Sequence, residues 1–419
     1  MALSESILKS KRTFIFLASF VSISLFLKAG FLSVSVILFV LYSLFNLRSA
    51  IRDQIKIHKI LLLPILLYLI CVLWILFTNN FEGATTIVGR KIPMLLFPFC
   101  FMLINKNLSS KDLQIILGVF LLGCLLCSLI CYGYALFNII QHKSIIDPNS
   151  DHTAYYFTYI SLAESVDMDP IYLGLYCNFA FVIAIKTPFV KNLLIRNLIV
   201  IYLGIFIILL ASKIGIITLV LTSFLLLITK TNKGTLSYIL LVLLIPAFLL
   251  GIYKSPYLKE RFTVSTQFNY TDPDGSHWSS TTARMAIWSC AVEAIKRRPV
   301  LGYGTAAGQD GLETIYKEKE FALGIFWAYN PHNEFLTTML DSGVVGLGSL
   351  CMMLILSFTS SIKSKDMLAI YFVIIIALCF CVESILLRQK GIIFFSFFYS
   401  LLFWYVNHTG ETDSEPSPL

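Results

Sequence analysis

The sequence predicts an all-α polytopic membrane protein with about twelve transmembrane helices and one large polar loop in its second half. Three observations lead to this class. Hydrophobic residues make up 57% of the 419 residues and charged residues only 13%, the mean hydropathy is +0.81, and long apolar runs recur along the chain. No soluble fold of this length needs so much apolar surface.

The apolar runs begin directly after Lys9, Lys11 and Arg12, a pattern typical of a retained signal anchor. A helix needs about 20 apolar residues to cross a bilayer, and several runs are shorter than that. The run near 92–104 is the weakest because it contains Pro93 and Pro98. The twelve predicted spans lie near 13–29, 31–47, 60–77, 92–104, 113–137, 171–186, 194–211, 214–229, 236–252, 334–358, 367–386 and 391–406.

The basic residues set the orientation. A net charge of +8 does not indicate a nucleic-acid partner here, because Lys and Arg of membrane proteins collect on the cytoplasmic side. With a cytoplasmic amino terminus the inner loops hold most of the cations, and an even number of helices returns the carboxyl terminus to the cytoplasm. The inner-loop cations are Arg48, Arg52, Lys56, Lys59, Lys106, Lys111, Lys186, Lys191, Arg196, Lys230, Lys233, Lys363 and Lys365.

Two outer segments are long, near 138–170 and 253–332, and loops of that length are usually functional. The second contains "TTARMAIWSCAVEAIKRRPVLGYG", which predicts a helix capped by Thr281 or Thr282 and ended by Pro299 and Gly302. The expected organisation is nine helices in 1–252, the large loop in 253–332, three helices in 333–406 and a cytoplasmic tail in 407–419.

Of the ten cysteines, nine fall in apolar runs, and Cys290 stands alone in a polar stretch. This distribution does not predict a disulfide framework.

His332 is the first candidate for chemistry. It follows Asn330-Pro331 and directly precedes an apolar helical run, so its ring lies near a helix amino terminus. The positive end of the helix dipole disfavours imidazolium, and a neutral imidazole can serve as a general base. The alternative is a histidine that only caps the helix. Gly343 and Gly346 follow, and they allow this helix to pack closely against a neighbour.

Four cations lie at the outer membrane edge, where the positive-inside rule disfavours them: Arg90, Lys213, Arg284 and Arg388. Basic groups in such positions suggest an anionic ligand, of which phosphate is the natural candidate. The alternative is that each side chain merely extends to the membrane interface.

Two acidic pairs, Asp167 with Asp169 and Asp272 with Asp274, have the spacing that holds a divalent ion in some transferases. Neighbouring proline and glycine explain both pairs equally well as turns. No P-loop, dinucleotide fingerprint, H-E-x-x-H or G-x-S-x-G motif is present.

Two stretches resemble a known family. "HNEFLTTMLDSGVVG", with His332, Asn333, Gly343 and Gly346, resembles the H-N-x9-G-x-x-G motif of the bacterial O-antigen ligases. The Arg284 helix and its "P-x-x-G-x-G" turn resemble the periplasmic loop of the same ligase and polymerase superfamily, and the predicted topology agrees. The matching motifs fall within roughly 281–348.

The resemblance implies a GT-C-type glycosyltransferase of the inner membrane that needs no metal or other cofactor. It implies a donor, O-antigen on undecaprenyl diphosphate, and an acceptor, a sugar of lipid A–core. On that basis His332 and Arg284 are expected to be catalytic, and Lys213, Arg90, Arg388 and Asn333 to bind the diphosphate. Where the family carries an arginine after serine or threonine, this chain has Ser212-Lys213, which keeps the charge but loses the planar fork.

Two other functions fit parts of the pattern. An O-antigen polymerase shares the topology and the donor but uses another lipid-linked glycan as acceptor. A polysaccharide transporter or flippase is less consistent, because transporters place charges near the bilayer midplane, whereas the polar groups here gather at one edge.

Overall fold

The structure is a computed structural model of the chain. It describes residues 2–45, 47, 58–103, 108–147, 155–187, 191–228, 270 and 280–412. The predicted span 236–252, residues Asp272 and Asp274, and the predicted boundary at 252/253 lie outside this part of the chain.

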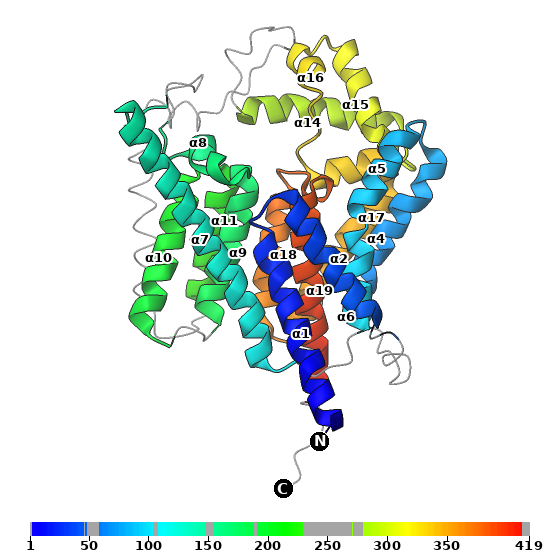
Figure 1. The fold of residues 1–419 in the computed structure, drawn as a ribbon. Coiled ribbons are helices and arrows are strands. Elements are labelled where there is room, and N and C mark those ends of the chain that lie inside the picture. Colours follow the sequence, from blue (N-terminus) through cyan, green and yellow to red (C-terminus); the bar gives the residue numbers. More distant parts are fainter. Residues whose placement is uncertain are drawn as a thin grey trace.

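The described residues form a bundle of upright helices with three helices lying over one end (Figure 1). Helix α1 begins, and helix α19 ends, at the other end of the bundle. The bundle helices are α1 (Ala2–Ser24), α2 (Ala29–Phe45), α4 (Leu62–Leu73), α5 (Phe81–Lys91), α6 (Pro93–Met102), α7 (Ser110–His142), α9 (Pro170–Lys186), α10 (Leu193–Leu209), α11 (Lys213–Ile228), α17 (Glu334–Lys363), α18 (Met367–Phe380) and α19 (Gln389–Thr412). Shorter elements are α8 (Tyr159–Ala163) and the 3-10 turns η1 (Lys59–Leu61), η2 (Trp74–Phe77), η3 (Glu164–Val166) and η4 (Ile385–Leu387).

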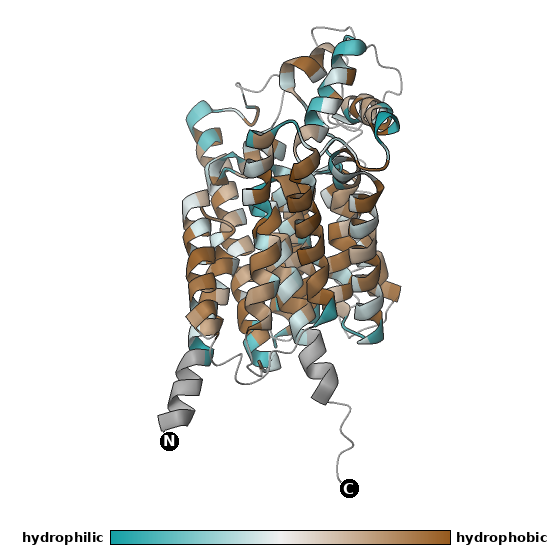
Figure 2. Cartoon of the chain, turned by 90° about the vertical axis from the view of Figure 1, so that its right-hand side faces the viewer, coloured by the Kyte–Doolittle hydropathy of each residue, from teal (hydrophilic) through white to brown (hydrophobic). Residues whose placement is uncertain are grey.

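Apolar residues cover the middle of the bundle, and polar residues gather at both ends, as expected for a polytopic membrane protein (Figure 2). Within the described residues, four helical segments are long and apolar enough to cross a bilayer: Lys59–Phe77, Phe81–Met102, Ser110–His142 and Glu334–Lys363. The bent pair Tyr159–Val166 and Pro170–Lys186 makes a fifth if it counts as one span, and four further apolar helices are shorter.

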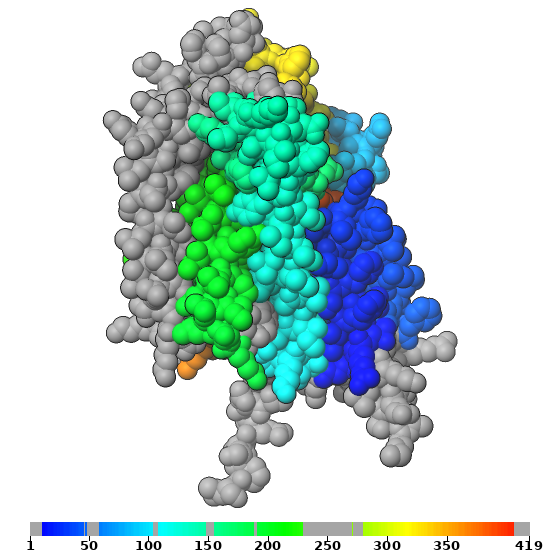
Figure 3. All heavy atoms as spheres, turned by 60° about the vertical axis from the view of Figure 1, so that its left-hand side comes forward, coloured from blue at the N-terminus to red at the C-terminus, as the bar shows by residue number. Residues whose placement is uncertain are grey.

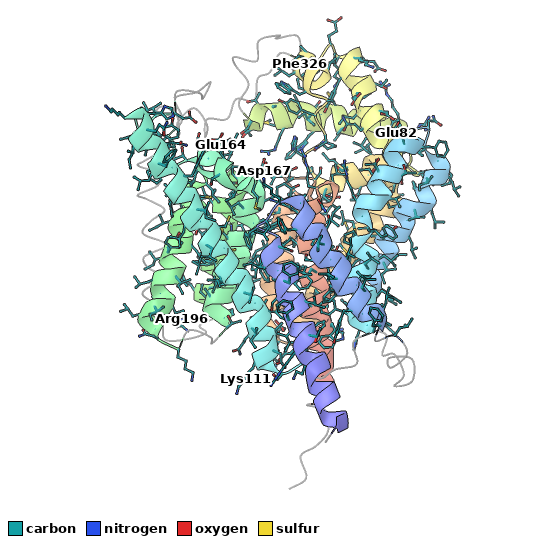
Figure 4. All side chains as sticks on the ribbon, in the orientation of Figure 1. Glu82, Lys111, Glu164, Asp167, Arg196 and Phe326 are labelled. Carbon is teal, nitrogen blue, oxygen red and sulfur yellow. The ribbon has the colours of Figure 1, made fainter. Side chains whose placement is uncertain are left out.

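Labelled charged residues lie at both ends of the bundle. Figure 4 places Lys111 and Arg196 at the end where α1 begins, and Glu82, Glu164 and Asp167 at the opposite end. This separation agrees with the inner and outer loops that the sequence predicts.

Two predicted boundaries were wrong. The run 92–104 contains α6, but α5 directly precedes it, so the helical segment Phe81–Met102 starts well before the predicted run. The run 367–386 ends at Phe380, because the chain turns there and carries Glu383 to His332, just before the start of α17.

The amino-terminal helices are joined to the rest of the bundle by both charge and packing. Helix α1 packs along α7 (Figure 3), and Lys11 forms an ion pair of 2.6 Å with Asp112. Asp112 also completes a capping box with Ser109 at the start of α7. Deeper in the bundle, Phe120 packs against Phe398 with ring centroids 4.7 Å apart.

Three helices form what we call the cap: α14 (Ser280–Arg297), α15 (Ala307–Glu318) and α16 (Ala322–Trp327). The cap helices pack around an apolar core that also includes Leu340 of α17, and this core contains Cys290, the cysteine that stood alone in the sequence. On its surface Arg297 forms two hydrogen bonds with Glu318.

The loop between α14 and α15 fastens the cap to the bundle. Helix α17 is kinked at Gly343, where φ is 59°, and a kink leaves backbone groups without helical partners. The loop supplies these partners: Tyr303 N–H donates to Leu340 O (2.8 Å), Gly304 N–H to Asp341 O (3.0 Å), and Pro299 O accepts from Val344 N–H (3.1 Å). The two motifs quoted from the sequence therefore interlock.

Gly343 and Gly346 were predicted to let this helix pack closely against a neighbouring helix. In the structure their roles are different. A Cβ on Gly343 would lie 2.1 Å from Val300 O. A Cβ on Gly346 would meet Ser342 Cβ of its own helix at 2.5 Å. Gly343 thus admits the cap loop, and Gly346 allows the helix to bend.

Candidate active site

The turn Asn330–Asn333 holds His332 in a left-handed conformation (φ 44°), which is unfavourable for a residue with a side chain. Three hydrogen bonds hold the turn. Asn330 Oδ1 accepts from His332 N–H (2.8 Å), the Trp288 indole donates to Pro331 O (2.8 Å), and Asn333 N–H donates to Ser384 Oγ (3.2 Å). Strain that is held so firmly is typical of functional sites.

The helix that follows does not use His332 as its cap. Asn333 is the N-cap of α17, and its Oδ1 accepts from Leu336 N–H (3.0 Å). Its Nδ2 donates to Cys381 O (2.8 Å). Both ends of the Asn333 amide are therefore engaged within the chain, and the imidazole is available for another purpose.

The imidazole faces Glu383. His332 Nδ1 lies 3.1 Å from Oε2 and 3.3 Å from Oε1 of this carboxylate. The Glu383 side chain is 8% exposed and the His332 side chain 27% exposed. A buried carboxylate needs a donor, so the neutral ring is expected to carry its proton on Nδ1 and to leave a lone pair on Nε2. A carboxylate orients the imidazole in the same way in hydrolase triads.

Hydrogen bonds from the turn after α18 to the start of α17 fix Glu383. Thr337 Oγ1 and Ser384 Oγ are 2.8 Å apart, and Leu386 N–H donates to the buried Glu334 Oε2 (2.8 Å). Sequence reasoning missed Glu383 because it falls inside the predicted span 367–386. A lone carboxylate in an apolar run is itself a signal of a functional site, so the sequence alone could have singled out Glu383.

Arg284 lies one helical turn before Trp288 on α14, and residues four apart share a face of a helix. Because Trp288 is bonded to Pro331, this face of α14 lies over the His332 turn. Asp169 is in electrostatic range of Arg284, His332 and Glu383, so all three residues lie in the neighbourhood of this carboxylate. Arg284 Nε is buried and has no hydrogen-bond partner among the described residues.

Two more predicted cations lie near this group. Lys213, the first residue of α11, donates to the hydroxyl of Thr281, three residues before Arg284. Arg388 is exposed at the start of α19 and is in electrostatic range of Tyr172, as is Glu383. The structure therefore gathers Lys213, Arg284, Arg388 and His332 from four separate elements.

Arg90 is placed differently. It lines a cavity of about 500 Å³ between α5, α15 and α17. The walls of this cavity include Asn330 and Pro331 of the His332 turn but none of the other three predicted cations.

Of the two acidic pairs, Asp167 and Asp169 belong to a turn. Asp169 is the N-cap of α9, and its Oδ1 accepts a hydrogen bond from Ile171 N–H (2.7 Å). In the part of the chain that the structure describes, no three His, Cys, Asp or Glu side chains form a group able to hold a metal ion.

The region around this site is similar to known proteins. Residues 198–351 match the model of the O-antigen ligase family, Wzy_C. This range contains Lys213, Arg284, His332, Asn333, Gly343 and Gly346. Over 89 residues the chain is 30% identical to the exopolysaccharide production protein ExoQ of Rhizobium meliloti (strain 1021), a match that spans 20% of either chain.

Proposed function

We propose, from the match of residues 198–351 to the model of the O-antigen ligase family, that this membrane protein transfers O-antigen from undecaprenyl diphosphate to a core sugar of lipid A–core. On this proposal the chain is a GT-C-type, metal-independent glycosyltransferase with about twelve spans, and the cap faces the periplasm from the inner membrane. The observation that carries the proposal is the His332–Glu383 pair beside an Arg284 whose Nε has no partner among the described residues.

The cations stabilise the diphosphate leaving group. The diphosphate meets the guanidinium of Arg284, with Lys213 and Arg388 nearby. As the bond between the anomeric carbon and the phosphate oxygen breaks, the electron pair stays on the diphosphate. Fixed cations stabilise this developing charge without having to reorganise. Among the predicted diphosphate ligands, Asn333 serves instead to hold the His332 turn.

His332 activates the nucleophile, which is the acceptor hydroxyl. Its Nε2 accepts the proton of the acceptor hydroxyl while that oxygen forms its bond to the anomeric carbon. Glu383 stabilises the imidazolium that results and holds the ring in place. A single displacement inverts the anomeric configuration, and the proton then passes to solvent.

Transfer by purified protein tests the proposal. Wild-type protein in detergent receives extracted undecaprenyl-diphosphate O-antigen and rough lipopolysaccharide, and the product is followed as banded lipopolysaccharide. His332→Ala should lower the rate by about 10²–10⁴-fold, the usual contribution of a positioned general base. His142→Ala, which changes an exposed histidine of α7, is the matched control. Transfer by His332→Ala at the wild-type rate would rule out the base.

Polymerisation is the second candidate, and the likeness to a protein of exopolysaccharide production favours it. A polymerase uses the same donor and the same His332 chemistry, but its acceptor is another lipid-linked glycan. The same assay separates the two, because a polymerase lengthens the glycan on undecaprenyl diphosphate and leaves rough lipopolysaccharide unmodified.

A further inference from the structure

We propose that the cavity between α5, α15 and α17 binds the sugar of the acceptor that receives the transferred glycan. This inference rests on the proposed glycosyl transfer and assigns one of its two substrates to a place. The volume of about 500 Å³ falls in the usual range for small-ligand sites. The polar lining includes Asn80, Glu82, Arg90, Gln309, Asp310 and Asn330.

The lining suits hydroxyl groups better than phosphate. Two carboxylates, those of Glu82 and Asp310, line the cavity together with one guanidinium, that of Arg90. The third carboxylate of the lining, that of Asp341, is buried near the ammonium of Lys91. A diphosphate would be repelled by this excess of negative charge. Sugar hydroxyls both donate and accept, so they can bond the carboxylates and also the guanidinium and side-chain amides. The charge balance therefore favours a neutral or amine-bearing sugar.

The polar groups around the cavity are held in place. Asn80 Oδ1 accepts from Gly83 N–H (2.9 Å), and its Nδ2 donates to Asp310 Oδ2 (3.1 Å). Gln309 Nε2 donates to Ala328 O (3.2 Å), which ties α15 to the segment before the His332 turn. Preorganised polar groups of this kind fix the orientation of a ligand.

The cavity borders the candidate site at the His332 turn. Asn330 and Pro331 form part of its wall, and Asn330 Oδ1 accepts the His332 N–H. Most of the other lining residues come from α5, α15 and α17, and Leu387 of η4 adds to the wall. Lys213 and Arg284 belong to α11 and α14, and Arg388 follows Leu387 at the end of η4. Two substrates can thus approach the same turn, the anionic donor among the cations and the hydroxyl-bearing acceptor in the cavity.

A matched pair of substitutions tests this assignment. Thr85 and Thr86 are neighbours on α5, both are exposed, and both hydroxyls donate to Glu82 O at 2.9 and 3.0 Å. Only Thr86 lines the cavity. Thr86→Trp should fill the cavity and raise the KM for rough lipopolysaccharide by about tenfold or more while the KM for the donor stays within about twofold. Thr85→Trp should leave both values near those of the wild type.

The outcomes separate this inference from the proposed function. Binding of rough lipopolysaccharide to each variant is measured without donor, so it does not depend on transfer. If binding weakens in Thr86→Trp but not in Thr85→Trp, the cavity assignment stands even if the wild type forms no glycosylated lipopolysaccharide. An unchanged affinity in Thr86→Trp overturns it, as does a loss confined to the donor.

Discussion

At the scale of single residues, the site depends on a histidine that adopts an unfavourable backbone conformation. A left-handed φ on a residue with a side chain costs about 1–3 kcal/mol and persists only where its surroundings enforce it. Asn330, Trp288 and Ser384 supply that enforcement through hydrogen bonds to the turn. The turn directs the ring at Glu383 rather than at the helix that follows.

Removing the charge of Glu383 should slow transfer without weakening substrate binding. In Glu383→Gln the amide is similar in size but cannot stabilise an imidazolium, so kcat should fall by about 10-fold to 10⁴-fold. The KM for donor and acceptor should each stay within about twofold, because Glu383 positions the ring and contacts neither substrate. Glu164→Gln, at an exposed acid of η3, is the control. A rise in KM with kcat unchanged would assign Glu383 to binding instead.

The sequence was enough to select His332, Arg284, Lys213 and Arg388, because titratable groups beside apolar runs are conspicuous. It could not show that Arg90 lies apart from the other three, since that depends on how α5 meets α15. It also gave no sign that Trp288 ties α14 to the His332 turn, because tryptophan is common at a membrane interface.

At the scale of elements, the kink of α17 and the loop that fills it hold the cap in place over the site. Gly343 has φ 59° and ψ −155°, a combination that is essentially restricted to glycine. Tyr303, Gly304 and Pro299 bond the backbone groups that the kink exposes. Because the same loop leads to α14, the position of Arg284 depends on this contact.

Substitution of Gly343 should therefore destabilise the protein. Gly343→Ala places a methyl group 2.1 Å from Val300 O in a conformation that alanine avoids. The midpoint of thermal unfolding should fall by about 5 °C or more. Gly348→Ala, where a Cβ would meet nothing within 4 Å, should leave the midpoint near the wild-type value. Equal midpoints for the two variants would show that the contact between α17 and the loop before α15 contributes little to the stability of the protein.

The ion pair on the cap should make its stability depend on pH. The hydrogen bond from Arg297 lowers the pKa of Glu318 below its ordinary value of 4.5. A lowered folded-state pKa stabilises the fold above the ordinary value, and this contribution is lost as the pH falls through the lowered pKa. Wild type should unfold at a higher temperature than Glu318→Gln at neutral pH, and the difference should shrink below about pH 4. A difference that is the same at both pH values would contradict the assignment.

Element positions could be predicted where the hydrophobic pattern is long. The run 113–137 lies within α7 and the run 171–186 coincides with α9, because each is long and apolar. The ends of runs could not be predicted as well. The sequence placed the start of one run near 92, but Lys91 is buried near Glu334 and Asp341, and the helical segment Phe81–Met102 continues through it.

At the scale of the whole molecule, the described chain places a polar cap on one end of an apolar bundle and gathers its candidate site at their junction (Figures 1 and 2). Lys213 of α11 and Arg284 of α14 meet there with His332, before α17, and Arg388, before α19, although 175 positions of sequence separate Lys213 from Arg388. The apolar runs could predict a membrane protein, but not which helices are neighbours, because apolar faces of similar composition pack in many ways.

The most direct test is an electron cryo-microscopy structure of the His332→Ala variant, which should not turn over, with undecaprenyl-diphosphate-linked glycan bound. We expect the diphosphate to contact the guanidinium of Arg284, with Lys213 or Arg388 beside it and the anomeric carbon toward position 332. A diphosphate bound in the cavity lined by Arg90, or at the other end of the bundle near Lys111, would contradict the proposed site.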